Sequence, residues 1–139
     1  MRQLLMSALL VSSSFAAFAA DGGLVVTISD IRRPGGHLLV SVESSAEGWS
    51  ADGKSVAVAR IAAQAGEVVQ RFDDLPPGHY AVQVMHDEND NGKLDSNFLG
   101  IPSEGYGFSQ NPGVMRRATF EEARFELPAE GAEILVRLR

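Results

Sequence analysis

Residues 87–95 of the 139-residue chain carry oxygen-bearing side chains at a spacing that binds hard cations. They read DENDNGKLD, with Asp or Asn at the first, third, fifth and ninth positions and Gly92 at the sixth. This spacing begins the calcium-loop pattern D-x-[DN]-x-[DN]-G, in which alternate side chains turn toward the ion. The sixth residue enters a turn that glycine adopts at the lowest cost. The sequence therefore predicts a calcium site whose ligands are the side chains of Asp87, Asn89, Asn91 and Asp95 and the backbone carbonyl of Lys93.

The pattern departs from an EF-hand in two respects. The twelfth position, where an EF-hand has a bidentate glutamate, is Phe98, and no helix is predicted on either side of the loop. We expect a similar loop on a β scaffold, with a further carboxylate from Glu88, Asp90 or Glu104. Two or three charges around the ion predict weak binding, with a Kd of about 10⁻⁴ to 10⁻³ M. The alternative is a tight, solvated turn without a metal, because Asp, Asn and Gly are common in such turns.

A second kind of chemistry centres on His86, which directly precedes the loop. A histidine beside Asp87 or Glu104 has the residue types for acid–base work in a small hydrolase. Neither a nucleophile elbow nor a metal-hydrolase motif accompanies it, and Ser103 and Ser109 lack the spacing of a catalytic triad. The residues therefore favour a binding loop over a catalytic site, and the hydrolase remains the alternative.

The stretch that follows, residues 97–109, is rich in glycine and aromatic residues. Together with residues 87–96 and 110–113 it forms a long loop, 87–113, with little strand pattern, and long loops in compact domains are often functional. We expect Phe98, Ile101, Tyr106 and Phe108 to fold back over an open end of the scaffold. Exposed aromatic side chains would instead indicate a binding platform.

The segments that must position this loop are short and alternate between apolar and polar residues, as β-strands do. Turn residues separate them, as in 33–36 and 73–78. The predicted strands are residues 24–28, 37–43, 56–61, 68–72, 80–86, a less regular segment at 118–127, and 134–138. About seven antiparallel strands at this spacing predict an all-β, two-sheet sandwich, with at most one helical turn, at 119–124.

The alternation also predicts which residues form the core. One face of each strand is apolar, and side chains on that face point into the space between the sheets. The apolar residues on these faces are Leu24, Val26, Ile28, Leu38, Val40, Val42, Tyr80, Val82, Val84, Ile134, Val136 and Leu138, and His86 shares the face of Val84 at the end of its strand.

The first nineteen residues have the pattern of a secretory signal peptide rather than of a folded segment. Arg2 supplies a positive start, residues 4–11 a short apolar run, and Ala17 and Ala19 a small-x-small cleavage motif. An N-terminal membrane anchor is the alternative, but the apolar run is shorter than the roughly 20 residues that span a bilayer. We expect cleavage after Ala19 or one residue later, a single domain over 20–139, and export to the periplasm or the medium.

Charge and cysteine content exclude several classes of function. The chain has 12 basic and 18 acidic residues, which argues against a nucleic-acid partner because such partners require a basic face. It has no cysteine, so disulfides, thiol nucleophiles and zinc–thiolate sites are excluded. We expect a monomer without a membrane span after cleavage.

Several segments resemble the bacterial exported family called domain of unknown function 2141: residues 75–82, 86–95, 97–109 and 120–125. The resemblance extends over essentially the whole predicted mature chain. It implies an exported protein with an immunoglobulin-like or transthyretin-like sandwich, and no activity is established for the family. Combining resemblance and residues, we expect a non-catalytic binding or structural module of the cell envelope that meets an envelope protein or a glycan.

Overall fold

The computed structural model describes residues 22–139, so the predicted signal peptide lies outside the described residues. Eight strands and two one-turn helices follow one another along the chain. They are β1 (Leu24–Ile31), β2 (His37–Glu43), α1 (Ala46–Trp49), β3 (Ala57–Ala62), β4 (Gly66–Phe72), β5 (Gly78–Asp87), β6 (Tyr106–Phe108), α2 (Phe120–Ala123), β7 (Phe125–Leu127) and β8 (Ala132–Arg137).

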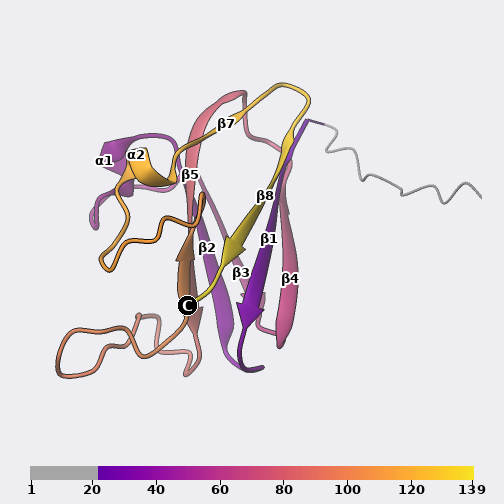
Figure 1. The fold of residues 1–139 in the computed structure, drawn as a ribbon. Helices are drawn as coiled ribbons and strands as arrows, with labels where there is room; N and C mark the ends of the chain where they lie inside the picture. The colour runs from indigo at the N-terminus through magenta and orange to yellow at the C-terminus, as the bar shows by residue number, and fades with distance from the viewer. Residues whose placement is uncertain (1–21) are drawn as a thin grey trace, which may run out of the picture.

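The strands form two sheets that face each other, which confirms the predicted all-β sandwich (Figure 1). The smaller sheet has the order β4-β1-β8, and the larger has the order β3-β2-β5-β6, with β7 pairing the first residues of β5. One detail differs from the prediction, because β1 and β8 run parallel while the other strand pairs are antiparallel.

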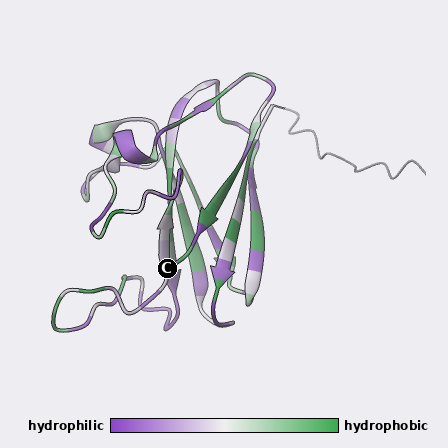
Figure 2. Cartoon of the chain, in the orientation of Figure 1, coloured by the Kyte–Doolittle hydropathy of each residue, from purple (hydrophilic) through white to green (hydrophobic). Residues whose placement is uncertain are grey.

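The core lies between the sheets and is built mainly from the apolar strand faces. It also includes three residues that alternation did not assign: Ile31, Phe125 and Leu127. Leu24, Val26 and Ile28 of β1 have no exposed surface, and neither have Leu38 and Val42 of β2. Hydrophobic residues accordingly follow the strands (Figure 2). Burying each such side chain stabilises the fold by about 1.5–3 kcal/mol, so this pattern accounts for the sandwich.

The turn before β5 holds the strand that leads to the predicted site. The Tyr80 hydroxyl donates a 2.6 Å hydrogen bond to the Pro76 carbonyl, as in the tyrosine corner of β-sandwiches. Burial raises the pKa of this hydroxyl above its ordinary value, because the charged form is disfavoured away from water. The residue thus fixes where β5 begins.

Helix α2 forms where a helical turn was predicted, and its sequence explains why. The Thr119 side chain accepts from the Glu122 amide, and the Glu122 carboxylate accepts from the Thr119 amide, which is a capping box. Helix α1 was not predicted; its N-cap is Ser45. Within residues 22–139, no helix is long and apolar enough to cross a membrane.

Both helices pack on the outer face of the larger sheet and form a second, smaller core. Its members surround the single tryptophan: Trp49, Ala81, Phe108, Ala118, Phe120 and Ala123. We call this group the tryptophan cluster. The Trp49 ring lies 5.8 Å from Phe108 and 6.4 Å from Phe120, and its indole N–H donates to the Ala118 carbonyl.

The stretch after β5 is more ordered than its sequence suggested. Strand β6 interrupts it, and Phe108 is buried in the tryptophan cluster. The expectation that Phe98 and Ile101 cover an open end of the sandwich is wrong, because they are 95% and 57% exposed. They lie in a turn held by the Asn97 side chain, which accepts from the amides of Leu99 and Ile101, and this turn projects into solvent.

Candidate functional site

The predicted calcium loop begins where β5 ends, and the neighbouring turn before β2 fits closely against it. A Cβ added to Gly36 would lie 2.0 Å from the Asp87 carbonyl oxygen, and the φ of Gly36 is +64°. Only glycine can occupy such a position. The sequence pair Gly35–Gly36, which signalled an ordinary turn, is therefore also what lets the loop approach.

Asp87 organises the loop from its buried first position, with 2% of its surface exposed. Its two carboxylate oxygens accept hydrogen bonds from the amides of Asn91, at 3.1 Å, and Gly92, at 2.7 Å. Gly92 has a φ of +77°, as the calcium-loop pattern requires at its sixth position. The chain therefore wraps around the first carboxylate in the way the pattern predicts.

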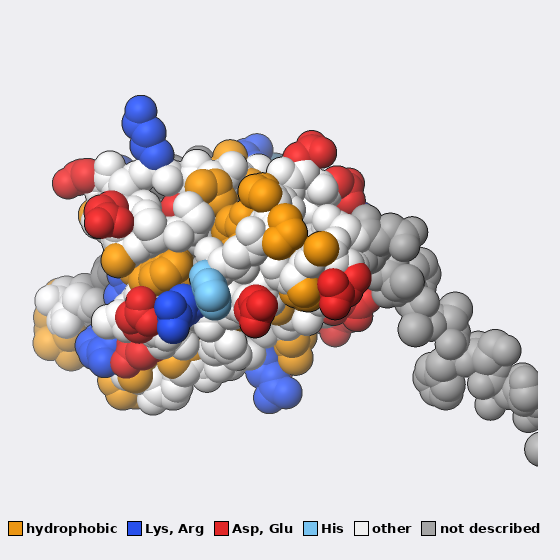
Figure 3. Space-filling model, turned by 90° about the horizontal axis from the view of Figure 1, so that it is seen from above, with side chains coloured by type: hydrophobic (Ala, Val, Ile, Leu, Met, Phe, Trp, Pro, Cys, Tyr) orange, Lys and Arg blue, Asp and Glu red, His pale blue; other side chains and the backbone are white. Residues whose placement is uncertain are grey.

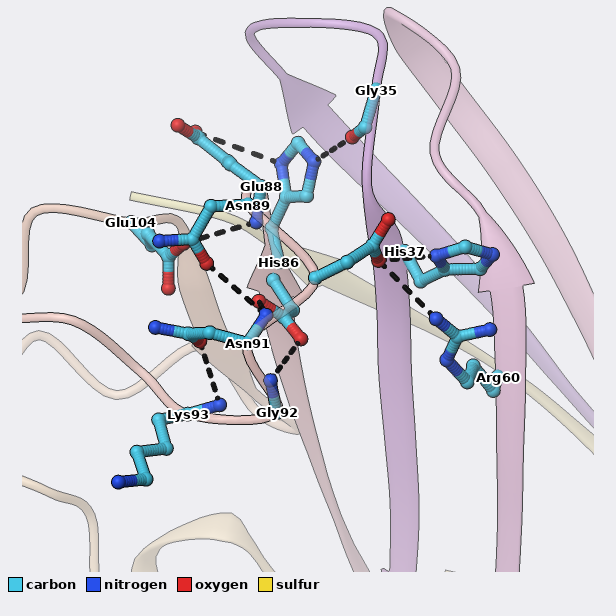
Figure 4. Close-up of polar contacts among 12 residues, drawn as sticks. Gly35, His37, Arg60, His86, Glu88, Asn89, Asn91, Gly92, Lys93 and Glu104 are labelled. Carbon is cyan, nitrogen blue, oxygen red and sulfur yellow. Dashed lines mark hydrogen bonds and ion pairs between the residues drawn. The ribbon is translucent and has the colours of Figure 1, made fainter.

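The other predicted side-chain ligands converge on Asp95. The Asn89 side-chain amide donates to one Asp95 oxygen at 2.6 Å, and the Asn91 side-chain amide donates to the other at 2.8 Å. The Oδ1 atoms of the two asparagines accept backbone amides, of Asn91 and Lys93 respectively. The structure thus brings four of the predicted ligand side chains into one hydrogen-bonded group (Figure 4 shows the asparagines and their backbone partners).

Glu104 is the further carboxylate that reaches the loop. It is 6% exposed, and its oxygens accept from the amides of Glu88, at 3.1 Å, and Asp95, at 3.0 Å. Glu104 therefore ties the beginning of the loop to its end. The sequence spacing alone could not choose it over Glu88 and Asp90. The Ser103 amide strengthens this closure by donating to the Asp95 carbonyl at 2.8 Å.

Asp90 and Glu88, the other two candidates for a further carboxylate, point elsewhere. Asp90 accepts from His37 at 2.5 Å and from Arg60 at 3.2 Å, so it pins the loop to the outer face of the larger sheet (Figure 4). Glu88 lies beside His86, with 3.9 Å between Oε1 and Nδ1. His37 and Arg60 were missed by the sequence reasoning, since they belong to other strands and match no local motif.

The residues present fit a hard cation in chemistry, though not in their present rotamers. Asp87, Asp95 and Glu104 supply carboxylates, and Asn89 and Asn91 supply amide oxygens, all of which calcium prefers. For both asparagines to bind an ion, their side-chain amides would have to turn Oδ1 instead of the nitrogen toward Asp95. Among the described residues, no group of three or more His, Cys, Asp or Glu side chains has the arrangement of a metal site. An ion here would depend on amide and backbone oxygens.

His86 does not have the surroundings of a general base. It is 1% exposed, and its Nε2 lies 2.8 Å from the Gly35 carbonyl. Because a carbonyl only accepts, Nε2 carries the proton, and only Nδ1 remains, facing Glu88. Ser109 is equally committed, since its hydroxyl accepts from the Val82 amide and donates to the Ala123 carbonyl.

A cavity of about 140 Å³ lies beside His86, between the 30–33 segment and the 102–105 segment. Its lining includes the carboxylate residues Glu88 and Glu104, but Glu104 is already bonded to two backbone amides. Ser103 lines the same cavity as His86, but among the described residues no hydrogen bond joins its hydroxyl to the histidine, so the nucleophile–base pair of a hydrolase is not formed.

Comparison with known proteins identifies the family. Neither the curated proteins nor the solved structures gave a match to the chain. The family model described as an uncharacterized protein conserved in bacteria (DUF2141) matches residues 26–134, which include the larger sheet, strand β4, residues 26–31 of β1, residues 132–134 of β8 and the whole candidate loop. The chain therefore belongs to the DUF2141 family of uncharacterized bacterial proteins.

Proposed function

We propose that this protein is a non-catalytic binding module of the bacterial cell envelope and that its 87–95 loop binds calcium. The observation that carries the proposal is the convergence of Asn89 and Asn91 on both oxygens of Asp95, beside the buried Asp87. In a tight turn, Asn and Asp side chains bond mainly to the backbone beside them, whereas here three side chains also bond to one another.

A bound cation would reduce the repulsion between the carboxylates of this loop. Three carboxylates, from Asp87, Asp95 and Glu104, lie within one hydrogen-bonded network whose internal donors are neutral amides. Like charges brought together in this way repel, and a divalent cation offsets that repulsion while it replaces the amide donors on Asp95. Calcium would thereby hold the loop in one shape.

The non-catalytic part of the proposal rests on His86. Its Nε2 is bonded to the Gly35 carbonyl and its ring is buried, so the residue serves packing and the approach of the neighbouring turn. The alternative, a small periplasmic hydrolase that uses His86 with loop carboxylates, has weaker support. It would need the ring to leave this bond before it could meet a substrate.

The cellular location is a further part of the proposal. Residues 1–19 have the charge, apolar run and small residues of a signal peptide, which supports export to the periplasm or the medium. Intact-mass measurement of the protein recovered from a periplasmic fraction tests this, with a mature chain beginning at Ala20 or Asp21 expected. Retention of Met1 in the cytoplasmic fraction would contradict it.

Thermal unfolding of the purified protein tests calcium binding. With a Kd of about 10⁻⁴ M, about 10 mM calcium stabilises the folded state by about 2.7 kcal/mol relative to EDTA. The midpoint should therefore rise in calcium and rise less in the same concentration of magnesium. Substitution Asp95→Asn, which removes a carboxylate on which both asparagines converge, should abolish most of the rise.

The matched control is Asp74→Asn, which removes an exposed carboxylate at the opposite end of β5. It should leave the calcium response unchanged. An unchanged midpoint at saturating calcium, or an equal loss of response in both variants, would reduce the loop to a solvated turn.

A further inference from the structure

The outer face of the larger sheet carries a shallow trough between the two regions that cover its ends. The floor consists of two cross-strand rows, given by the strand register: Val58, Ser41, Gln83 and Phe108 in one, and Arg60, Leu39, Met85 and Tyr106 in the other. Both covering regions lie on the same side of the sheet (Figure 1). The tryptophan cluster lies beyond the first row, and the 87–95 loop lies beyond the second.

Two cavities lie along this floor. One, of about 230 Å³, lies between Leu94, Pro102 and Met115, and the other, of about 410 Å³, lies over Leu39 and Val58. Both are lined by Gln83 and Met85, so they lie side by side on the same face of the sheet. We call the two together the outer trough and define it by Leu39, Val58, Gln83, Met85, Met115 and Arg117.

The charges in the outer trough have one sign although the chain has a net charge of −6. The charged side chains that line the two cavities are Arg60, Arg116 and Arg117. Asp90 neutralises Arg60, and Glu122 binds both terminal nitrogens of Arg116 at 2.8 Å. The trough therefore keeps one uncompensated positive charge, that of Arg117.

Arg117 is also held in position. Its Nη2 donates to the Trp49 carbonyl at 2.6 Å and to the Gln83 side chain at 2.9 Å, and its guanidinium lies 5.3 Å from the centre of the Trp49 ring. These partners are neutral, so Nη1 and Nε remain free to donate to an incoming acceptor. A guanidinium fixed in this way is ready to bind a carboxylate.

The apolar part of the trough is unusually accessible. Met115 is 98% exposed and Val58 is 72% exposed, at opposite sides of the trough. Large apolar side chains grouped on a surface lose water when a partner covers them, which favours binding. The trough thus combines apolar contact area with a single positive anchor.

We propose that the outer trough binds an extended segment of another protein, with apolar side chains on the floor and an Asp or Glu carboxylate on Arg117. A trough that carries apolar side chains and one fixed cation fits an extended peptide, whose side chains alternate along its length. The fixed positive charge of Arg117 complements a carboxylate, which a peptide segment supplies through Asp or Glu. The inference deepens the proposed function, on which it rests for the class of activity, a non-catalytic binding module.

The calcium loop and the outer trough meet at two places. Leu94 and Pro102, which line the trough, belong to the segment that Glu104 and Asp95 close. Asp90 joins the loop to Arg60 on the floor. An ion that fixes the loop should therefore tighten segment binding without being required for it.

Selection of a phage-displayed library of random 12-residue peptides on the immobilised protein tests the proposal. The selected peptides should contain Asp or Glu among apolar residues. A fluorescein-labelled copy of the best peptide should bind at least about tenfold more weakly to Arg117→Gln and to Met115→Glu, because the first removes the anchor and the second places a like charge beside the peptide carboxylate. Met115 is nearly fully exposed, so its substitution leaves the fold intact.

The matched control is Val69→Glu, which alters an exposed valine on β4 of the other sheet and should leave peptide binding unchanged. Recovery of no peptides, peptides without acidic residues, or equal weakening in all three variants would overturn the proposal. Flotation with phosphatidylglycerol vesicles that Met115→Glu abolishes would assign the surface to lipid instead. Peptide binding that persists in EDTA and in Asp95→Asn would uphold the trough even if calcium binding fails.

Discussion

Two regions cover the outer face of the larger sheet at opposite ends, and they are held together by different forces. The tryptophan cluster is apolar, with the Trp49 ring against those of Phe108 and Phe120. The 87–95 loop is polar, with Asp87 and Glu104 bonded to backbone amides. The first buries apolar surface and is complete without a ligand, whereas the second collects carboxylates that a cation would stabilise.

The two regions also differ in the side chains that the surface around them exposes. Seen from the end that carries the helices, acidic and basic side chains are interspersed with hydrophobic ones (Figure 3). At the loop end, the projecting turn exposes Phe98, Leu99 and Ile101. Around the tryptophan cluster, which apolar packing holds together, the surface mixes charged and hydrophobic side chains. At the loop end, where hydrogen bonds to the backbone fix the chain, large apolar side chains are exposed to solvent.

The largest effect is expected from breaking the apolar region. Trp49→Ala removes the centre of the cluster and should lower the free energy of unfolding by about 3–5 kcal/mol, equally in EDTA and in calcium. Urea denaturation followed by circular dichroism measures this. Trp49→Phe is the control, since it keeps a ring and loses the bond to the Ala118 carbonyl, for about 1 kcal/mol. A loss below about 1 kcal/mol for the alanine variant would show that the cluster adds little to the sandwich.

A smaller effect should follow from changing the polar region. Glu104→Gln leaves one of two buried backbone amides facing an N–H₂ group, which should cost about 1–3 kcal/mol in EDTA. Because both Glu104 oxygens already serve the backbone, calcium should still raise the unfolding midpoint. Glu126→Gln, on the exposed side of β7, is the matched control. Loss of the calcium response in Glu104→Gln alone would make Glu104 an ion ligand.

The smallest effect concerns a polar bond at the edge of the apolar region. The hydrogen bond from Arg116, with that from the Thr119 amide, lowers the pKa of Glu122 from 4.5 to about 2. A lowered folded-state pKa stabilises the fold above pH 4.5, and this contribution disappears as the pH falls toward 2. The difference in unfolding midpoint between wild type and Glu122→Gln should therefore be present near neutral pH and shrink in that window. Because the pair is exposed, the difference should be small. Parallel pH profiles would contradict it.

Much of the sandwich was predictable because period-two alternation follows directly from burial on one face. Strand β2 has the predicted bounds, His37–Glu43, and the ends of β3, β4 and β5 lie within two residues of their predictions. The helical turn at 119–124 was predictable because Thr119 and Glu122 form a local capping box.

What could not be predicted depends on contacts between distant segments. Tyr106–Phe108 forms β6 because β5 offers an unpaired edge, and three residues carry too little alternation to signal a strand. Glu104 closes the calcium loop from nine positions beyond Asp95, outside any local motif. Asp90 is turned to the sheet by His37 and Arg60, and only the folded register brings those residues near it.

The parallel pairing of β1 with β8 has a consequence for how the protein acquires its structure. Leu24 pairs with Ala132, so the central strand of the smaller sheet obtains its second neighbour only when the last segment of the chain is available. Such long-range pairing is slow, because a large loop must close before the contact forms. During synthesis, the edge of β1 therefore stays open until residues 132–137 have emerged, and in that interval it is exposed to chaperones and to aggregation.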